Sequence, residues 1–398
     1  MDDLVASLHV PVRFRVRFTR HAFAPDNPAL AELMPGTGGR PARVLVAIDA
    51  GLVAAWPGAA DAIATWFRAQ SERVHLTAWP EVVPGGEAAK ADRSVVDRLC
   101  ALAADQHLCR HSYLLAVGGG AMLDAVGLAA ALVHRGLRLV RMPTTTLAQC
   151  DGGLGVKNAI NAFGQKNFLG TFQAPWAVLD DLALLERQDD RSWRAGIAEA
   201  VKVGVIKDAA AIGELEQLAP RLARRDPAAL ETVIRRCAAL HLDHICQGGD
   251  PFEQGSSRPL DFGHWSAHRL EVLSRHRLLH GEAVAIGVAL DCAYAVTHGW
   301  LAAADGERIA RILHTVGLPL WDAAADLRDA QGHRQILGGL EQFREHLGGS
   351  LTLAMPQGLG RRHDISAMPA EEVEQAITLL QAWRRSFATR SDRISLSH

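Results

Sequence analysis

The chain has 398 residues, which is too many for one small core and enough for two domains of ordinary size. Its formal net charge of −2 gives it no general attraction for nucleic acid or for acidic membranes, and it has no run of about 18 apolar residues that would predict a membrane span. The six cysteines lack the paired or dense spacing of disulfide frameworks and thiolate zinc sites. We therefore expect a cytoplasmic enzyme that binds neither nucleic acid nor membranes.

The first half of the sequence alternates short β-branched runs with apolar helical patterns, which predicts a largely parallel sheet with helices. The strict alternation of V-R-F-R-V-R-F after Pro11 favours an edge strand with one face in solvent. The predicted strands are VPVRFRVRF near Val10, RVLVAID ending at Asp49, RVHLTAW near Val74, YLLAVGGG ending at Gly120, LRLVRMP ending at Pro143 and PWAVLD ending at Asp180.

From about Arg191 onward, long segments rich in Ala, Leu, Glu and Arg at helical spacing predict a mostly helical second part, with one late strand, LTLAM, ending at Met355. Residues 247–259 are predicted to be a loop because they are rich in Gly, Pro and Ser. We therefore predict an α/β domain over residues 1–185 and a helical domain over residues 186–398, with the active site in the cleft between them.

The segment YLLAVGGGAMLDAVGLAAAL places three glycines, residues 118–120, between a predicted buried strand and a helix. Such a turn brings backbone N–H groups and a positive helix terminus close to a phosphate, and a dinucleotide pyrophosphate would suit it. The spacing is not G-x-G-x-x-G, and a plain tight turn would also explain it. Asp49 at a strand end, together with Glu87 and Lys90 on one turn, favours nucleotide binding, since a carboxylate there can accept from ribose hydroxyls.

Residues 144–170, TTTLAQCDGGLGVKNAINAFGQKNFLG, are too polar for a core strand. Lys157, Lys166, Asn161 and Asn167 would give this segment a dense set of donors for a polyhydroxylated anionic ligand. Lysine is scarce here: only five of the 42 basic residues are lysines, so 37 are arginines. A retained lysine suits a site that needs a compact ammonium, although a solvated surface loop is the alternative interpretation.

A candidate metal site is distributed over three segments. RAGIAEAVKVGVIKD places Glu199 and Lys202 on one helix face, DFGHWSAH places His264 and His268 on one face, and His280 begins HGEAVAIGVAL. Two histidines and a carboxylate can bind zinc and leave one position open. With 18 histidines in the chain, any one of them alone is more simply explained as an exposed or hydrogen-bonded side chain.

Taken together, these segments resemble 3-dehydroquinate synthase and its relatives, the sugar phosphate cyclases, which include 2-epi-5-epi-valiolone synthase. The resemblance runs from about Asp49 to about Gly358. It is carried, in family order, by the GGG-x-x-x-D of residues 118–124, Arg135–Gly136, the PTT and AQ-x-D stretch, Lys166–Asn167, A-E-x-x-K, G-H-x-x-x-H and the H-G-E at His280. It implies a Rossmann-like N-terminal domain that holds NAD⁺ and a helical C-terminal domain that supplies most of the metal site.

The resemblance also implies roles for individual residues. The implied ligands of Zn²⁺ or Co²⁺ are Glu199, His264 and His280. Asp151, Lys157, Lys202 and Asn167 would contact the hydroxyls and phosphate of the substrate, with His268 near the phosphate. Arg135 would reach the phosphate bound by a neighbouring subunit, which implies a homodimer. The predicted cofactor-binding residues are Asp49, Glu87, Lys90, Gly118, Gly119, Gly120, Asp124, Thr144, Thr145 and Lys166.

The implied reaction is that of a carbon–oxygen lyase acting on a seven-carbon ketose phosphate. An alcohol of the sugar phosphate is oxidised transiently by NAD⁺, inorganic phosphate is eliminated, the hydride returns, and the opened ring closes as a carbocycle in an intramolecular aldol reaction. NAD⁺ is therefore not consumed.

The sequence departs from the family pattern where 3-dehydroquinate synthase binds the carboxylate of its heptulosonate substrate. C-A-A-L-H puts His241 where that pattern has a lysine, and Asp261 stands where it has an asparagine. The loop at residues 247–259 is longer than usual, so Arg258 matches the carboxylate-binding arginine only in a shifted register. The late lysine is missing, and Arg344 or His346 could replace it.

Losing a cation and gaining an anion disfavours a carboxylate ligand. We therefore expect a neutral heptulose phosphate such as sedoheptulose 7-phosphate as the substrate. The alternatives are a 3-dehydroquinate synthase that uses the heptulosonate, and a metal-dependent polyol dehydrogenase of the glycerol dehydrogenase kind.

Overall fold

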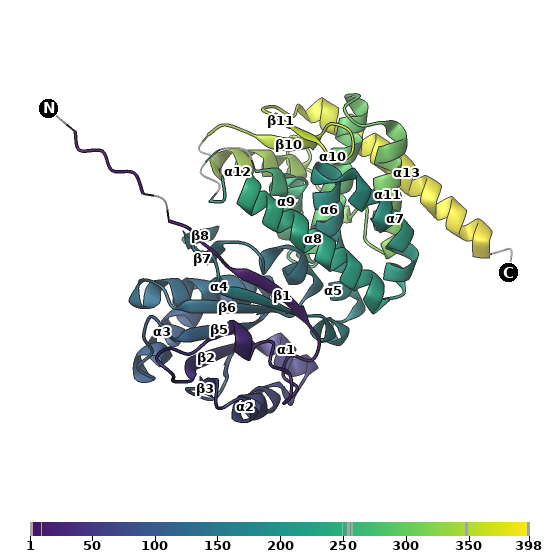
Figure 1. Ribbon diagram of the computed structural model, residues 1–398. Helices are drawn as coiled ribbons and strands as arrows, with labels where there is room; N and C mark the ends of the chain where they lie inside the picture. Colours follow the sequence, from purple (N-terminus) through teal and green to yellow (C-terminus); the bar gives the residue numbers. More distant parts are fainter. Residues whose placement is uncertain are drawn as a thin grey trace. The chain divides into compact units, whose positions relative to one another are not determined.

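A computed structural model of the chain describes residues 3–8, 10–248, 250–252, 255, 258–346 and 349–395. It divides into two compact units (Figure 1). The first unit comprises Met1–Thr144 and Gly155–Leu184, and the second comprises Thr145–Leu154 and Leu185–His398. The first unit is α/β and the second is mostly helical, so the predicted fold class is confirmed.

A parallel sheet forms the centre of the first unit (Figure 1). Within the described residues it has seven strands in the order β1-β9-β6-β5-β2-β3, and β4 also pairs with β2. Every predicted strand of this half is present, although several are shorter than predicted. The bounds are β1 Arg15–Thr19, β2 Ala42–Asp49, β3 Val74–Leu76, β4 Glu81–Val83, β5 Tyr113–Gly118, β6 Arg138–Pro143 and β9 Ala177–Asp181.

Both faces of this sheet are covered. In β2, Val44 and Val46 point to one face while Leu45 and Ala47 point to the other, and all four are buried. Helix α4 contacts β5 and β6. The helices of this unit are α1 Ala50–Ala55, α2 Ala59–Ala69, α3 Ser94–Asp105 and α4 Gly120–Leu132.

The first strand lies at the edge of the sheet, as the alternating sequence predicts. It pairs in parallel with β9 over Arg15–Thr19 only. The prediction of a strand from Val10 is wrong, because β9 offers partners only from Ala177 onward and the Val10 side chain is exposed.

The polar segment that follows β6 is not part of the central sheet, again as predicted. It forms a separate antiparallel hairpin of β7, Lys157–Ala162, and β8, Gln165–Phe172, which the sequence did not predict. The hairpin packs on α4 through β7. Alternating polar and aromatic residues in β8 leave much of that strand exposed, as expected for a sheet with one solvated face.

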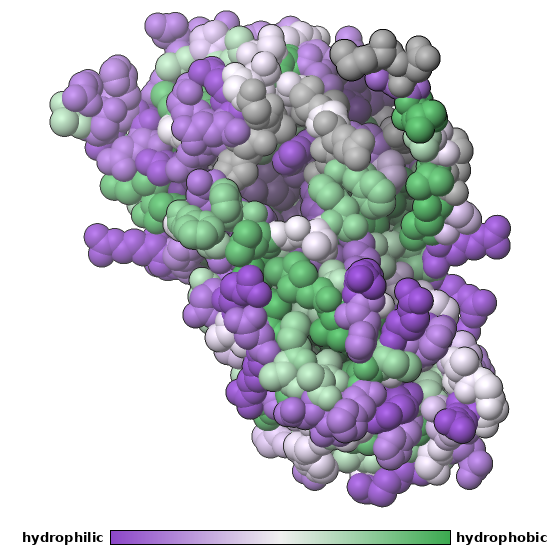
Figure 2. All heavy atoms as spheres, turned by 90° about the vertical axis from the view of Figure 1, so that its left-hand side faces the viewer, coloured by the Kyte–Doolittle hydropathy of each residue, from purple (hydrophilic) through white to green (hydrophobic). Residues whose placement is uncertain are grey.

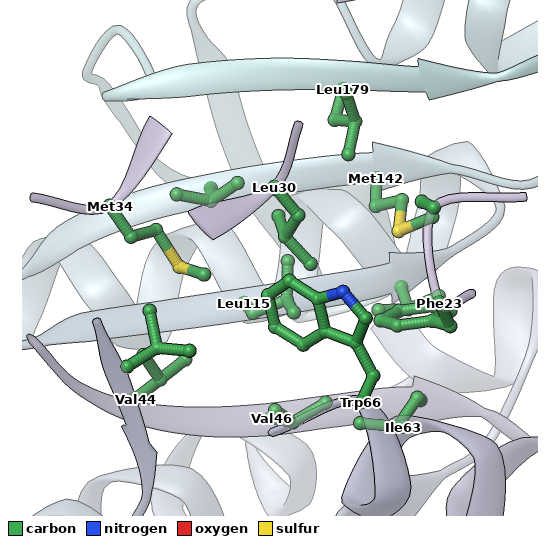
Figure 3. Packing of buried hydrophobic residues seen from close by; sticks show 14 of the residues in the cluster. Phe23, Leu30, Met34, Val44, Val46, Ile63, Trp66, Leu115, Met142 and Leu179 are labelled. Atoms are coloured by element: carbon green, nitrogen blue, oxygen red, sulfur yellow. The ribbon is translucent and has the colours of Figure 1, made fainter. Parts of the chain in front are cut away.

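The hydrophobic core of the first unit surrounds Trp66 of α2 (Figure 3). Its indole packs edge-on against Phe23, at a centroid distance of 6.1 Å, and Figure 3 shows it between the strand side chains and the N-terminal segment that carries Leu30 and Met34. The indole N–H donates to the carbonyl of Asn27 at 3.0 Å, so its one polar atom is satisfied. Trp66 thus links the helix, the sheet and the segment after β1.

The second unit is built around α10, which is buried along nearly its whole length and contacts α6, α9, α11 and α13. A late antiparallel pair of strands contains the last three residues of the predicted LTLAM strand, Leu353–Met355, within β10. No described helix is both long and apolar enough to span a membrane. The bounds are α5 Asp190–Ala195, α6 Ile197–Lys207, α7 Ala209–Ala223, α8 Pro227–Gln247, α9 His264–Leu273, α10 His280–Thr297, α11 Ala303–Val316, α12 Gly338–His346, α13 Ala370–Ser395, β10 Leu353–Pro356 and β11 Arg362–Ile365.

Replacement of Trp66 tests this description of the core. We expect Trp66→Ala to lower the free energy of unfolding by about 3–5 kcal/mol, because it removes a fully buried indole and leaves a cavity. Urea denaturation followed by circular dichroism measures the change. Trp79 is the matched control: it is 57% exposed, and Trp79→Ala should cost less than about 0.5 kcal/mol. Equal losses in the two variants would contradict this account.

Candidate active site

Six elements of the second unit bring the predicted metal and substrate residues together. Helix α6 carries Glu199 and Lys202, α9 begins at His264 and α10 begins at His280. Asp151 lies on the π-helical turn Ala148–Gly152, which belongs to this unit. The remaining members are His268 on α9, His241 on α8 and Asp261 on the short 3-10 helix Pro259–Asp261.

Three histidines and one carboxylate surround a common point. The possible ligand atoms of His264, His268 and His280 all lie within 4.8 Å of one another. Glu199 Oε1 is 3.9 Å from His264 Nε2 and 3.7 Å from His280 Nε2. The structure therefore brings together the three residues that we predicted as metal ligands, and adds His268 as a neighbouring fourth side chain.

Contacts at Nδ1 fix the orientation of two of these rings, those of His264 and His280. The Nδ1 of His264 is 3.1 Å from the carbonyl oxygen of Phe262, and the Nδ1 of His280 is 3.3 Å from Glu271 Oε1. Each contact suits a ring that donates through Nδ1 and turns Nε2 toward Glu199. Burial, together with Lys202 and His280, lowers the pKa of His264 to about 3, so this imidazole is neutral and can serve as a ligand.

Lys202 lies between two carboxylates. Its Nζ is 2.5 Å from Glu199 Oε2 and 3.2 Å from Asp151 Oδ2, and only 1% of the side chain is exposed. Burial opposes the charged form of this lysine, but Asp151 and Glu199 outweigh burial and raise its pKa. Burial likewise opposes the charged form of Asp151, yet Lys202, His241 and His264 hold its pKa well below the usual range. The pair is therefore ionised.

These residues fit a divalent cation. The Oε2 of Glu199 lies 2.5 Å from Lys202 Nζ, whereas Oε1 has no hydrogen-bond partner within the described residues, and burial raises the pKa of this carboxyl group. A cation in front of Glu199 would compensate its buried charge. Neutral imidazole nitrogens with one carboxylate oxygen are a donor set that zinc and cobalt accept.

The residues that depart from the family pattern lie beside this cluster. His241 is buried, and its Nδ1 is 3.3 Å from Asp151 Oδ1. Asp261 acts electrostatically on both Lys202 and His264. Arg258 is partly buried immediately before the short helix of Asp261.

Residues 249, 253, 254, 256 and 257 of the long loop, and the side chain of His346, lie outside the described residues. Arg344 pairs with Glu341 at 2.9 Å, so its predicted role in place of the missing lysine stays a prediction.

The glycine turn of the first unit joins a strand to a helix as predicted. Gly118 ends β5, Gly119 caps α4 and Gly120 is its first residue. The carboxylate of Asp49 accepts hydrogen bonds from the backbone of Gly51 at 2.7 Å and of Gly119 at 3.2 Å. A Cβ built on Gly118 would lie 2.8 Å from the Cβ of Asp49, so glycine is required there. Asp49 thus holds the turn, and the ribose contact that we predicted for it stays a prediction.

The other predicted cofactor residues are paired or bonded within their own units. Lys90 is buried and pairs with Asp124 at 2.7 Å, and Glu87 pairs with Lys166 at 3.4 Å. The backbone N–H of Thr144 donates to the carbonyl of Gly118 at 3.0 Å. In the second unit, the hydroxyl of Thr145 accepts from the backbone of Ala148 at 3.1 Å, at the start of the turn that carries Asp151. Their contacts to a cofactor remain predictions.

The hairpin that carries Lys157 and Asn167 is fixed to the sheet by a buried arginine that the sequence analysis missed. Arg141 of β6 donates to the carbonyls of Gly155 and Lys157, both at 2.8 Å, and to Asn158 Oδ1 at 2.7 Å. A charged residue inside a predicted core strand was the available signal.

Arg135 and Asn167 project from strained positions. Both have positive φ, at 64° and 57°, and both side chains are exposed. A positive φ is uncommon for residues with a side chain, and such strain often marks functional segments. The predicted roles of these residues depend on a substrate and, for Arg135, on a second subunit.

Comparisons with known proteins agree with the resemblance drawn from the sequence. The model of the 3-dehydroquinate synthase N-terminal domain matches residues 81–195, and that of the C-terminal domain matches residues 196–335. The 2-epi-5-epi-valiolone synthase of Streptomyces glaucescens is 35% identical over 373 residues, which cover 92% of this chain and 91% of that protein.

A 3-dehydroquinate synthase of Desulforamulus reducens is 36% identical over 280 residues, which cover 70% of this chain and 76% of that protein. Among solved structures, ValA, a 2-epi-5-epi-valiolone synthase of Streptomyces hygroscopicus subsp. jinggangensis 5008 with NAD⁺ and Zn²⁺ bound, matches with a TM-score of 0.82 and 29% identity. That match covers 95% of this chain and 99% of the other. Because the family models span more than half of the sequence and relatives above 30% identity cover most of it, the chain belongs to the 3-dehydroquinate synthase family.

Proposed function

We propose that the protein is a sugar phosphate cyclase, a carbon–oxygen lyase that converts a seven-carbon ketose phosphate to a carbocycle with loss of inorganic phosphate. The observation that carries the proposal is the cluster of Glu199, His264 and His280 beside the buried Lys202–Asp151 pair. NAD⁺ and Zn²⁺, the groups bound in the ValA structure, are the proposed cofactors, with Co²⁺ as an alternative metal.

Glu199, His264 and His280 would hold the metal ion, which when bound acidifies a substrate alcohol and polarises the ketone that replaces it. The first unit would hold NAD⁺ at the glycine turn of residues 118–120, where the positive end of α4 suits a pyrophosphate. When bound there, NAD⁺ would supply a reversible hydride acceptor.

The chain's own side chains bind the sugar and handle its protons. Lys202 donates from Nζ to a hydroxyl oxygen, and Asp151 accepts from a hydroxyl through an oxygen that faces away from Lys202. Lys157 and Asn167 of the hairpin are proposed to bind further oxygens, and His268 is proposed to bind the phosphate. Because both Lys202 and Asp151 are ionised before substrate binds, the site is preorganised for a polyhydroxylated ligand.

Charge favours a substrate without a carboxylate. Asp151, Asp261 and Glu199 all act on Lys202, whereas the nearby His241 replaces the lysine of the family pattern. A substrate carboxylate in this position would lack the lysine of the family pattern and would face Asp261, and both changes disfavour it. A ketose phosphate such as sedoheptulose 7-phosphate is therefore the proposed substrate, and the heptulosonate is the alternative.

Turnover of the two sugars tests the activity. With catalytic NAD⁺ and Zn²⁺ or Co²⁺, we expect inorganic phosphate to be released from sedoheptulose 7-phosphate without net NADH, and NMR of the product to show a carbocycle. Lys202→Met should reduce this turnover by at least about 100-fold, since it removes a charge-assisted contact in the site. Lys207→Met, on the same helix, is the matched control and should stay active. Release only from the heptulosonate would identify a 3-dehydroquinate synthase, and stoichiometric NADH would identify a polyol dehydrogenase.

Metal content tests the ligand set. The purified protein should bind about one zinc ion per chain, and His264→Ala or Glu199→Gln should retain less than about a tenth of it, measured by atomic emission after dialysis against trace zinc. Phosphate release should stop after treatment with a chelator and return with Zn²⁺ or Co²⁺. His314→Ala on α11 is the control histidine and should bind zinc normally. Full zinc occupancy in the Glu199 and His264 variants would rule out this ligand set.

We propose a cytoplasmic homodimer in which Arg135 of each chain reaches the substrate phosphate bound by the other. The exposed apolar side chains of the first unit support an interface there, since such patches often mark association surfaces. They include Phe163, Phe168 and Phe172 of the hairpin and Leu132 at the end of α4. Figure 2 shows apolar patches on the face that lies to the left in Figure 1.

Complementation between two inactive variants tests this arrangement. Arg135→Ala and Lys202→Ala homodimers should each be nearly inactive. When the two chains are co-expressed, a heterodimer contains one site with an intact Lys202 and an intact partner arginine, so random pairing should restore about a quarter of wild-type activity. Sedimentation of the wild type should give a dimer mass. Activity of the Arg135→Ala homodimer, or no restoration in a confirmed heterodimer, would exclude a shared site.

A further inference from the structure

His264 and His280 begin α9 and α10, and His268 lies one turn into α9, so the geometry of the cluster depends on how α9 and α10 cross. The crossing point lies at Gly263, directly before His264, and at Gly287. A Cβ built on Gly287 would lie 2.0 Å from the carbonyl oxygen of Gly263, and one on Gly263 would lie 2.8 Å from the backbone nitrogen of Val288. Gly263 also has a φ of 78°. The helices therefore meet backbone to backbone beside a proposed metal ligand.

One carboxylate binds the chain on both sides of His264. Asp291 lies one helical turn after Gly287 on α10. Its Oδ2 accepts from the backbone N–H of Gly263 at 3.0 Å, and its Oδ1 accepts from the indole N–H of Trp265 at 2.8 Å. The residue before His264 and the residue after it are thus fixed to the same side chain of the facing helix.

Burying a carboxylate between two packed helices is unfavourable in free energy. Asp291 is 1% exposed and, within the described residues, accepts only these two hydrogen bonds and has no basic partner. Burial raises its pKa to about 7, which shows how unfavourable its charge is there. An apolar side chain would bury more easily if packing were the only requirement. What the carboxylate provides is two acceptor atoms in a fixed geometry.

The ring of His264 depends on the same segment. Its Nδ1 lies 3.1 Å from the carbonyl oxygen of Phe262, the residue before Gly263, and its Nε2 faces Glu199. A shift of the turn at Gly263 would therefore move the backbone of His264 and the group that orients its ring at the same time.

We infer that Asp291 is a positioning residue for the metal site: by binding Gly263 and Trp265 it holds the start of α9 so that His264 Nε2 points at the common site with Glu199 and His280. The inference rests on the proposed function, because it requires that these residues bind a metal ion. It adds Trp265 and Asp291, which touch none of the proposed ligands' nitrogen atoms, to the residues that determine metal affinity.

The test compares Co²⁺ binding by the full-length apoprotein and its variants, followed by the visible absorption of the bound ion. Asparagine is nearly isosteric with aspartate but offers one acceptor and one NH₂ group, so in Asp291→Asn either the Gly263 or the Trp265 N–H would face another donor. We expect Co²⁺ affinity to fall about 10- to 100-fold and the absorption bands to shift in position or intensity. Trp265→Phe removes only the indole donor and should give a smaller change of the same kind.

Combining the two substitutions should partly restore the Co²⁺ affinity that Asp291→Asn loses. In Asp291→Asn with Trp265→Phe, the asparagine oxygen can accept from Gly263 while its NH₂ group no longer faces an indole N–H. Co²⁺ affinity should therefore be higher than in Asp291→Asn alone, a non-additivity expected only of residues in direct contact. Leu313→Ala in the buried face of α11 is the control for general destabilisation, and it should lower thermal stability without changing the Co²⁺ spectrum.

The outcomes separate this inference from the proposed function. If the wild type binds no Co²⁺, the metal site itself is wrong and the inference falls with it. If the wild type binds Co²⁺ and Asp291→Asn matches it in affinity and spectrum, the metal site stands and the positioning role is rejected. If Asp291→Asn does not fold, Trp265→Phe decides: a Co²⁺ affinity and spectrum like those of the wild type reject the positioning role, and a change in both supports it.

Discussion

The ammonium of Lys202 lies inside the second unit between the carboxylates of Glu199 and Asp151, and the rest of the candidate site depends on this contact. Without the lysine, the buried carboxylate of Glu199 and the partly buried carboxylate of Asp151 would lack a compensating charge, and breaking a buried ion pair costs about 3–5 kcal/mol. The lysine also restricts Glu199, so that the other carboxylate oxygen faces His264 and His280. One buried cation therefore connects the proposed metal ligands with the proposed sugar-binding residues.

The sequence predicted those parts of the molecule that follow from local patterns. Alternating and continuous apolar runs identified the strands of the central sheet, and the three glycines marked the junction of β5 and α4. The residues of the metal cluster could be named because Glu199 and Lys202 share one helix face, His264 and His268 share another, and His280 begins a helical segment. Their meeting at one point could not be derived from spacing, since it depends on how α6, α9 and α10 pack; the family resemblance supplied it.

What the sequence missed are contacts between distant segments. Arg141 binds the hairpin, at least 14 residues further along the chain. Glu271 contacts His280, nine residues away, and Asp291 binds the start of α9, at least 26 residues away. Nothing in a single sequence pairs a charged residue inside an apolar pattern with its distant partner. The true length of β1 was missed for the same reason, because the strand extends only as far as its neighbour β9 offers partners.

The hydrogen bonds that Arg141 donates fix one end of the hairpin, its base at residues 155–158. The opposite end, its tip at residues 163–164, is the part that can vary. At the base, Gly127 leaves room for Asn158, since a Cβ there would lie 1.8 Å from the Asn158 side-chain oxygen, and the guanidinium holds the carbonyls of Gly155 and Lys157. Nearer the tip, Lys166 pairs with Glu87 at 3.4 Å, and the turn at residues 163–164 is exposed. Evolution or a protein engineer could thus exchange the tip to recognise another sugar while the direction of Lys157 stayed set by the core of the first unit.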